Sequence, residues 1–128
     1  MILDTSAIIA VLTQEPDAAR LLEKLESSRT VGVGAPTLTE ASVVLSGRLG
    51  SRGILILGRF LEDLGASVIP FGELHWRQAA VAYQQFGKGR HPAALNFGDC
   101  MAYAVARVAR QPLLCIGNDF SKTDLEIA

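Results

Sequence analysis

Short apolar segments alternate along this chain with longer segments of helical spacing, and this alternation constrains its fold more than any other feature. The shortest and most apolar segments are residues 1–3 and 112–116, and residues 31–34 and 67–70 are further strand candidates. Helices are expected over residues 7–12, after Glu15-Pro16, and over 36–49, 52–64, 73–86 and 96–110. Strands that are each followed by a helix favour a parallel sheet. We therefore predict an α/β sandwich with a small, mostly parallel central sheet flanked by helices.

The length and composition predict a single domain over residues 1–128. The chain has 128 residues, of which 49% are hydrophobic, enough for one substantial core. No stretch approaches the ~20 apolar residues of a membrane-spanning helix, and no secretory leader is recognisable at residues 1–4. Cys100 and Cys115 lie among apolar residues, as reduced thiols packed in a core commonly do. We expect a reduced, cytoplasmic protein without a disulfide or a membrane segment.

The overall charge excludes a generally basic nucleic-acid binder. Lys and Arg number 12 against 13 Asp and Glu, a net charge of −1, so any nucleic acid must bind to a local patch. The loop of residues 87–95 is the one place where cations gather without acids, and it holds Lys88, Arg90 and His91. We expect these side chains to contact backbone phosphates. A solvated flexible loop is the alternative.

A few acids stand where strands end or helices begin. They are Asp4, Glu40, Asp99 and Asp119, with Asp124 as a fifth candidate. Each has a local explanation, since Asp4 could be a helix N-cap, Thr37-x-x-Glu40 and Asn96-x-x-Asp99 have capping-box spacing, and Asn118-Asp119 could form an Asx turn. Taken singly, each acid is therefore a candidate cap.

Taken together, the acids indicate a metal site. In a parallel sheet the carboxyl ends of the strands converge on one edge, and Asp4 and Asp119 directly follow the two most apolar strand candidates. Asp99 and Glu40 lie one turn inside their helices among apolar neighbours. Carboxylates gathered in this way resist ionising unless a cation lies between them, and Mg²⁺ or Mn²⁺ prefers such oxygen ligands. The histidines lack a second ligand at helical or turn spacing, so nothing indicates zinc.

Four motifs, in this order, resemble those of the PIN-domain ribonucleases, in particular the VapC toxins of bacterial toxin–antitoxin pairs. They are Met1-Ile2-Leu3-Asp4-Thr5-Ser6-Ala7, Leu38-Thr39-Glu40-Ala41, Leu95-Asn96-Phe97-Gly98-Asp99-Cys100 and Gly117-Asn118-Asp119-Phe120-Ser121-Lys122-Thr123-Asp124. The resemblance implies a PIN fold, Mg²⁺- or Mn²⁺-dependent endoribonuclease activity and a cognate VapB-type antitoxin. It also implies that Asp4, Glu40 and Asp99 are the core metal-binding acids, with Asp119 as the fourth and Asp124 as a possible further ligand.

The chemistry of phosphodiester cleavage agrees with this assignment. Attack on an anionic phosphodiester requires charge neutralisation and a nucleophile generated near neutral pH, and bound metal supplies both. We expect Asp4, Glu40 and Asp99 to coordinate the metal directly or through water, and one of them or Asp119 to position the attacking water. Thr5 and Ser6 offer hydroxyl and N–H groups at a helix start, which favours phosphate; the alternative is that they only cap the helix.

Two other functions compete with the nuclease. An aspartate-based phosphotransfer domain fits poorly, because Asp4-Thr5-Ser6 lacks the second acid two positions on and no lysine ends a late strand. A non-catalytic domain that keeps the PIN fold and binds a partner is the other alternative, which the intact acids disfavour.

Some apolar residues are candidates for binding surfaces. The helical segment 53–61 is more hydrophobic than a surface helix of a monomer, which predicts a homodimer contact or an antitoxin groove unless the segment is core. Tyr83, Phe86 and Phe97 could stack on RNA bases, but we expect all three to pack in the core.

Overall fold

The computed structural model describes residues 1–128 and contains one four-stranded parallel sheet. The strands are β1 (Ile2–Leu3), β2 (Gly32–Gly34), β3 (Ser67–Ile69) and β4 (Leu113–Leu114), in the order β3-β2-β1-β4. All three pairings are parallel. The predicted α/β class and parallel sheet are therefore confirmed.

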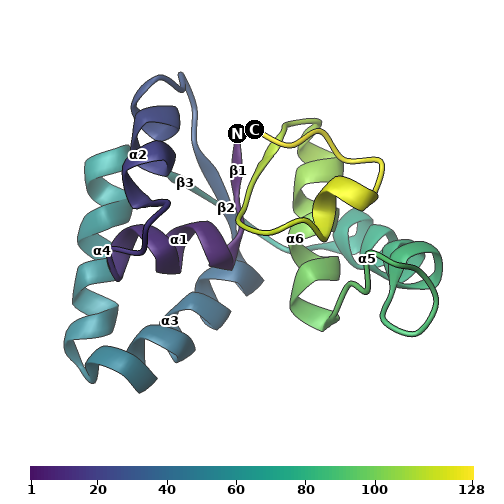
Figure 1. Ribbon diagram of the computed structural model, residues 1–128, viewed down its shortest axis with the longest axis horizontal. Helices are drawn as coiled ribbons and strands as arrows, with labels where there is room; N and C mark the ends of the chain where they lie inside the picture. Colours follow the sequence, from purple (N-terminus) through teal and green to yellow (C-terminus); the bar gives the residue numbers. More distant parts are fainter.

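Helices cover both faces of the sheet (Figure 1). On one side lie α1 (Thr5–Leu12), α2 (Ala18–Glu26), α3 (Ala35–Leu49) and α4 (Arg52–Leu64). On the other lie α5 (Glu73–Phe86), α6 (Phe97–Ala109) and the short 3₁₀ helix η1 (Phe120–Lys122). The molecule is thus a three-layer sandwich, and none of its helices has the length and apolar character needed to cross a bilayer.

The central strands are buried on both faces, which explains why their sequences are continuous apolar runs. Leu3 and Leu114 pack in the core beneath α1–α4, whereas Ile2 and Leu113 pack in the core beneath α5 and α6. Successive side chains of a strand point to opposite faces, so strands of two residues supply both cores at once. Cys100 and Cys115 are buried free thiols in the second of these cores.

Some local expectations need correction. Thr37 and Glu40 do not form a capping box, because α3 starts at Ala35 with Gly34 as its N-cap and Pro36 in its first turn. Pro36 suits a first helical turn, and the helix therefore begins before Thr37, which is buried. The sequence also did not predict that the last residues extend the sheet: Leu113 N–H donates to Glu126 O and Ala128 N–H donates to Leu113 O, both at 2.9 Å.

The expected core packing of the three aromatic residues is correct for one of them. Phe86 is half-buried and packs against the second core. Phe97 is 80% exposed and Tyr83 is 43% exposed, so the expectation is wrong for Phe97 and incomplete for Tyr83. Phe97 is the first residue of α6, where its side chain lies outside the packed layer.

Helix α4 keeps only part of its apolar surface in the core. Gly53 and Leu57 are buried, while Ile54 and Leu55 are 58% and 74% exposed. A core position therefore does not explain the apolar run, and an apolar face of this helix is left open.

The approach of α6 to β2 generates a testable prediction. A Cβ added at Gly34 would lie 2.7 Å from Cγ2 of the buried Val105, although the backbone φ of −67° suits any residue. We expect Gly34→Ala to lower the free energy of unfolding by about 1–3 kcal/mol through overpacking. Gly47→Ala on α3, which meets nothing within 4 Å, should instead stabilise the protein by about 0.5–1 kcal/mol.

Urea unfolding of the single and double mutants at positions 34 and 105 tests whether contact with Val105 causes this loss of stability. Val105→Ala removes the atoms that the new methyl group would meet, so Gly34→Ala should cost less in that background. Strictly additive costs of the two substitutions would show that the space at Val105 is not what excludes a side chain from position 34.

Candidate active site

Asp4, Glu40 and Asp99 line one surface depression of about 300 Å³. Asp4 directly follows β1, Glu40 comes from α3, and Asp99 comes from the first turn of α6. The depression therefore lies at the carboxyl end of a central parallel strand, the edge where such sheets bind ligands. Thr5 and Ser6, at the start of α1, contribute to the same lining.

Asp4 is buried and held by Ser6. Its Oδ2 accepts the Ser6 backbone N–H at 3.0 Å and the Ser6 hydroxyl at 2.6 Å, which makes Asp4 the N-cap of α1. The Ser6 hydroxyl in turn accepts the backbone N–H of Ile116 at 3.0 Å. Burial raises the pKa of Asp4, and the hydrogen bonds from Ser6 and Thr5 oppose that rise. The expected cap and a place in the depression thus coexist in one residue.

Asp99 is held by a reciprocal pair of hydrogen bonds with Asn96. Asp99 Oδ2 accepts the Asn96 backbone N–H at 3.0 Å, and Asn96 Oδ1 accepts the Asp99 N–H at 2.8 Å. This is the expected capping box. Desolvation is the largest cause of the raised pKa of Asp99, the Asn96 hydrogen bond opposes it, and the charges of Asp4, Asp119 and Glu40 raise it further. All four candidate acids are therefore close enough to interact electrostatically.

The Glu40 carboxylate lies against a glycine. A methyl group at Gly98 would overlap Glu40 Oε2, so a side chain at position 98 would have to displace this carboxylate. The residue lies inside the predicted motif Asn96-Phe97-Gly98-Asp99 but was not itself singled out. A close approach of the backbone to another group is one of the usual reasons for a glycine.

The two acids near the carboxyl end of the chain are placed differently from the first three. Asp119 is exposed at the start of η1, 3.9 Å from Lys122 Nζ, and is not part of the lining of the depression. Asp124 Oδ1 accepts the Tyr103 hydroxyl at 2.6 Å, and its Oδ2 lies 3.4 Å from Arg107. Both oxygens of Asp124 are therefore engaged by α6.

Sequence reasoning missed two charged residues of the depression. Arg48 is the only cation in the lining, and its guanidinium lies 3.7 Å from Glu15 Oε1. Arg48 stands eight positions after Glu40 on α3, close to two helical turns and so on the same side of the helix. That spacing could have identified Arg48, whereas nothing in the sequence brings Glu15 to this place.

The basic loop lies at another cavity. None of Lys88, Arg90 and His91 lines the depression. Lys88 lines a cavity between α5 and α6, and the Arg90 guanidinium lies 5.4 Å from the centre of the Tyr83 ring. His91 accepts the Ala93 N–H at 3.0 Å through Nδ1, and its ring packs edge-on against Phe86.

The donor set fits a hard divalent cation, although the side chains do not converge on a finished metal site. No group of three or more His, Cys, Asp or Glu side chains is close enough to hold an ion as placed. The available donors are carboxylate oxygens; besides desolvation, which is the largest cause, repulsion by the other carboxylates raises the pKa of Asp99. Such repulsion is relieved by a cation, and the exposed Glu40 and Asp119 side chains can turn toward one.

Comparisons with known proteins identify the family. The model of the PIN domain family matches residues 1–126. Ribonuclease VapC36 of Mycobacterium tuberculosis is 44% identical over 127 residues, which cover 98% of this chain and 91% of that protein.

Solved structures share the fold. Mycobacterium tuberculosis VapC20, a Sarcin-Ricin loop cleaving toxin, superposes with a TM-score of 0.80 at 17% identity, covering 99% of this chain and 97% of that chain. A toxin–antitoxin complex from Klebsiella pneumoniae gives a TM-score of 0.73 at 16% identity, covering 99% and 95%. At these identities the likeness shows the fold alone, whereas the family model and the 44% identical relative show more: this chain belongs to the PIN-domain family and, within it, to the VapC ribonucleases.

Proposed function

We propose that this chain is the toxin of a type II toxin–antitoxin pair, a divalent-metal-dependent endoribonuclease that a cognate VapB-type antitoxin inhibits. The observation that carries this proposal is that Asp4, Glu40 and Asp99 line one depression at the carboxyl end of β1. The name of its relative VapC36 describes a ribonuclease, and the Klebsiella pneumoniae structure is a toxin–antitoxin complex. Residues 1–128 act together as one PIN domain.

In this proposal Asp4, Glu40 and Asp99 hold Mg²⁺ or Mn²⁺, and Asp119 is the fourth acid. When bound, the ion neutralises charge on the phosphate and lowers the pKa of water. Asp124 is a weaker candidate ligand, because Tyr103 and Arg107 already engage it.

Residues in and beside the depression orient the carboxylates and receive the phosphate. Ser6 fixes the rotamer of Asp4, and Asn96 fixes that of Asp99. Arg48 places a guanidinium where it can contact an RNA phosphate once that phosphate competes with Glu15. The backbone N–H groups at the start of α1 favour an anion, and the buried Thr5 belongs to that turn.

The open apolar face of α4 is the proposed contact surface for the antitoxin or for a second copy in a homodimer. Ile54 lies beside a shallow groove between α3 and α4, lined also by Leu38, Leu57 and Leu61. Exposed contiguous apolar surface of this kind marks interaction sites.

Neutralising Asp99 distinguishes a role of this residue in metal binding from a role in capping α6. We expect Asp99→Asn to lower RNA cleavage by at least about 100-fold and to weaken Mn²⁺ binding. In chelator its melting temperature should equal or exceed that of the wild type, because the amide removes a charge that Asp4, Asp119 and Glu40 repel. The measurements are cleavage of a labelled single-stranded RNA, calorimetric Mn²⁺ titration and thermal unfolding.

Asp63→Asn is the matched control, since Asp63 is 70% exposed on α4 and pairs only with Arg59 at 3.6 Å. It should cleave RNA like the wild type. If Asp99→Asn also cleaves at the wild-type rate per folded molecule, Asp99 is only a cap and the proposed metal site is wrong.

A methyl group at Gly98 tests Glu40 without changing Glu40 itself. We expect Gly98→Ala to displace the Glu40 carboxylate and to reduce cleavage by about tenfold or more. The melting temperature should change little, because the overlapping atom is the end of a flexible side chain that can rotate away. Gly58→Ala, at a helical glycine with nothing within 4 Å, should retain full activity and gain slightly in stability. Full activity in Gly98→Ala would remove Glu40 from the proposed site.

A charge on α4 tests the contact surface. We expect Leu55→Arg to leave RNA cleavage unchanged. It should weaken inhibition by the co-expressed antitoxin or shift a dimer toward monomer, because the arginine would have to lose its hydration in an apolar contact. Inhibition assays and sedimentation velocity report the two outcomes. Unchanged inhibition together with an unchanged sedimentation coefficient would exclude this face as a contact surface.

A further inference from the structure

A second cavity lies outside the carboxylate depression, between α5 and α6. It has a volume of about 780 Å³, within the range of small-molecule sites. Aromatic rings dominate its lining: Phe71, Trp76, Tyr83 and Phe97. Phe97 is 80% exposed and Trp76 is 49% exposed, so aromatic surface that would normally be covered is open to solvent. The Arg77 guanidinium lies 4.7 Å from the centre of the Trp76 ring, and the Trp76 indole N–H donates to Glu73 at 2.8 Å. No acidic residue lines the cavity itself.

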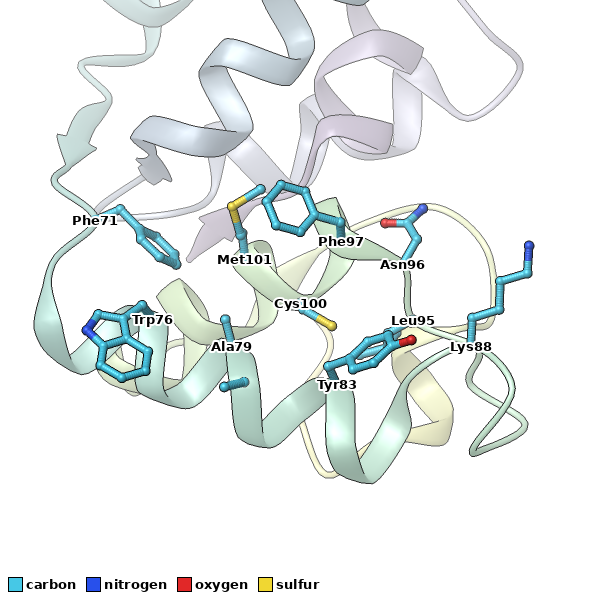
Figure 2. Close-up of a pocket in the computed structure, with 11 residues that line it drawn as sticks. Phe71, Trp76, Ala79, Tyr83, Lys88, Leu95, Asn96, Phe97, Cys100 and Met101 are labelled. Atoms are coloured by element: carbon cyan, nitrogen blue, oxygen red, sulfur yellow. The ribbon is translucent and has the colours of Figure 1, made fainter.

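One end of the cavity is polar and positive. Figure 2 shows Lys88 and Asn96 together at that end, opposite Phe71 and Trp76. Arg90 adds a second cation nearby, because its guanidinium lies 5.4 Å from the centre of the Tyr83 ring. Apolar ring faces flanked by cations are complementary to a molecule that combines flat apolar groups with negative charges.

The cavity and the carboxylate depression share no lining residue, but neighbouring residues at the start of α6 contribute to each. Asn96 lines the cavity and also binds Asp99 through two hydrogen bonds, and Phe97 stands two residues before Asp99. Gly98, between them, borders Glu40. Side chains two positions apart point to different sides of a helix, so a chain molecule bound at the carboxylates would pass over the start of α6 to reach Phe97.

We propose that this cavity is a nucleobase subsite, in which a base of single-stranded RNA leaves its own stack and packs against Phe97, Trp76 and Tyr83. Lys88 and Arg90 bind the phosphates next to that base, and the scissile phosphate lies at the carboxylates. The proposal rests on the proposed ribonuclease function. Unpaired bases stack on aromatic side chains with little regard to sequence, because every base has a π face. The carboxylates themselves repel the RNA backbone, so binding requires neighbouring cations and apolar contacts of this kind.

Trp76 reports on the cavity directly, because it is the only tryptophan of the chain. Stacking of a base should quench its fluorescence. We would titrate the whole protein in EDTA with single-stranded hexa-adenylate RNA, and with an abasic hexamer that carries the same phosphates without bases. Hexa-adenylate should quench Trp76, and the abasic hexamer should not. Since this readout needs no cleavage, it can fail in an active ribonuclease or succeed in an inactive one.

Substitutions of Phe97 identify the contact. Phe97→Ala and Phe97→Leu should weaken hexa-adenylate binding by about tenfold, because both lose the aromatic face, whereas Phe97→Tyr should bind like the wild type. Val43→Ala, at a residue 67% exposed on α3, is the control outside the cavity. Replacing both Lys88 and Arg90 by alanine should weaken the binding of both hexamers and make that binding less dependent on salt concentration.

Several outcomes would overturn the proposal. One is the absence of quenching by hexa-adenylate, and another is equal affinity in Phe97→Ala and the wild type. A third is binding that survives in Phe97→Leu, which would point to a general apolar contact. If sedimentation shows that Phe97→Ala turns a dimer into a monomer while RNA leaves Trp76 fluorescence unchanged, the cavity is an interface between two copies of the chain.

Discussion

The hydrogen-bonded link from Asp4 through Ser6 to Ile116 is the interaction on which the rest of the site depends. It joins the residues that follow β1 and β4, the two most apolar strands, and it lies at the carboxyl edge of the sheet. Each of these strands has only two residues, so few backbone hydrogen bonds join them. The hydrogen bond between Ile116 and Ser6 adds a connection beyond the ends of the strands. The same link holds a buried carboxylate in one orientation, so the local order of the sheet and the position of Asp4 have a common cause.

Much of the fold could be predicted because each layer leaves a local pattern. Ile2 and Leu3 face opposite cores, and such strands appear in the sequence as unbroken apolar runs. The predicted start of α3 at residue 36 lies one residue from the observed start at Ala35, but Thr37 and Glu40 do not form the capping box that their spacing allows, because Gly34 is the N-cap. Spacing alone does not say whether a capping box forms.

The candidate site was predictable only as far as strand ends determine it. Asp4 and Asp99 carry cap signatures in the sequence, and the structure places both at one depression. Glu15 and Arg48 join them through the packing of α1 against α3, which leaves no trace in either segment alone. Phe97 was misassigned to the core because its apolar character does not reveal that the first turn of α6 projects past the packed layer.

The short stretch from Asn96 to Asp99 concentrates several roles in a single turn of helix. It contains the N-cap, the exposed ring, the glycine that borders Glu40 and one of the acids. A molecule that covers only this turn would obstruct the carboxylates and the aromatic cavity at the same time. Inhibition here would require a footprint of a few residues and no change in the shape of the protein, and a rising concentration of substrate would displace such an inhibitor.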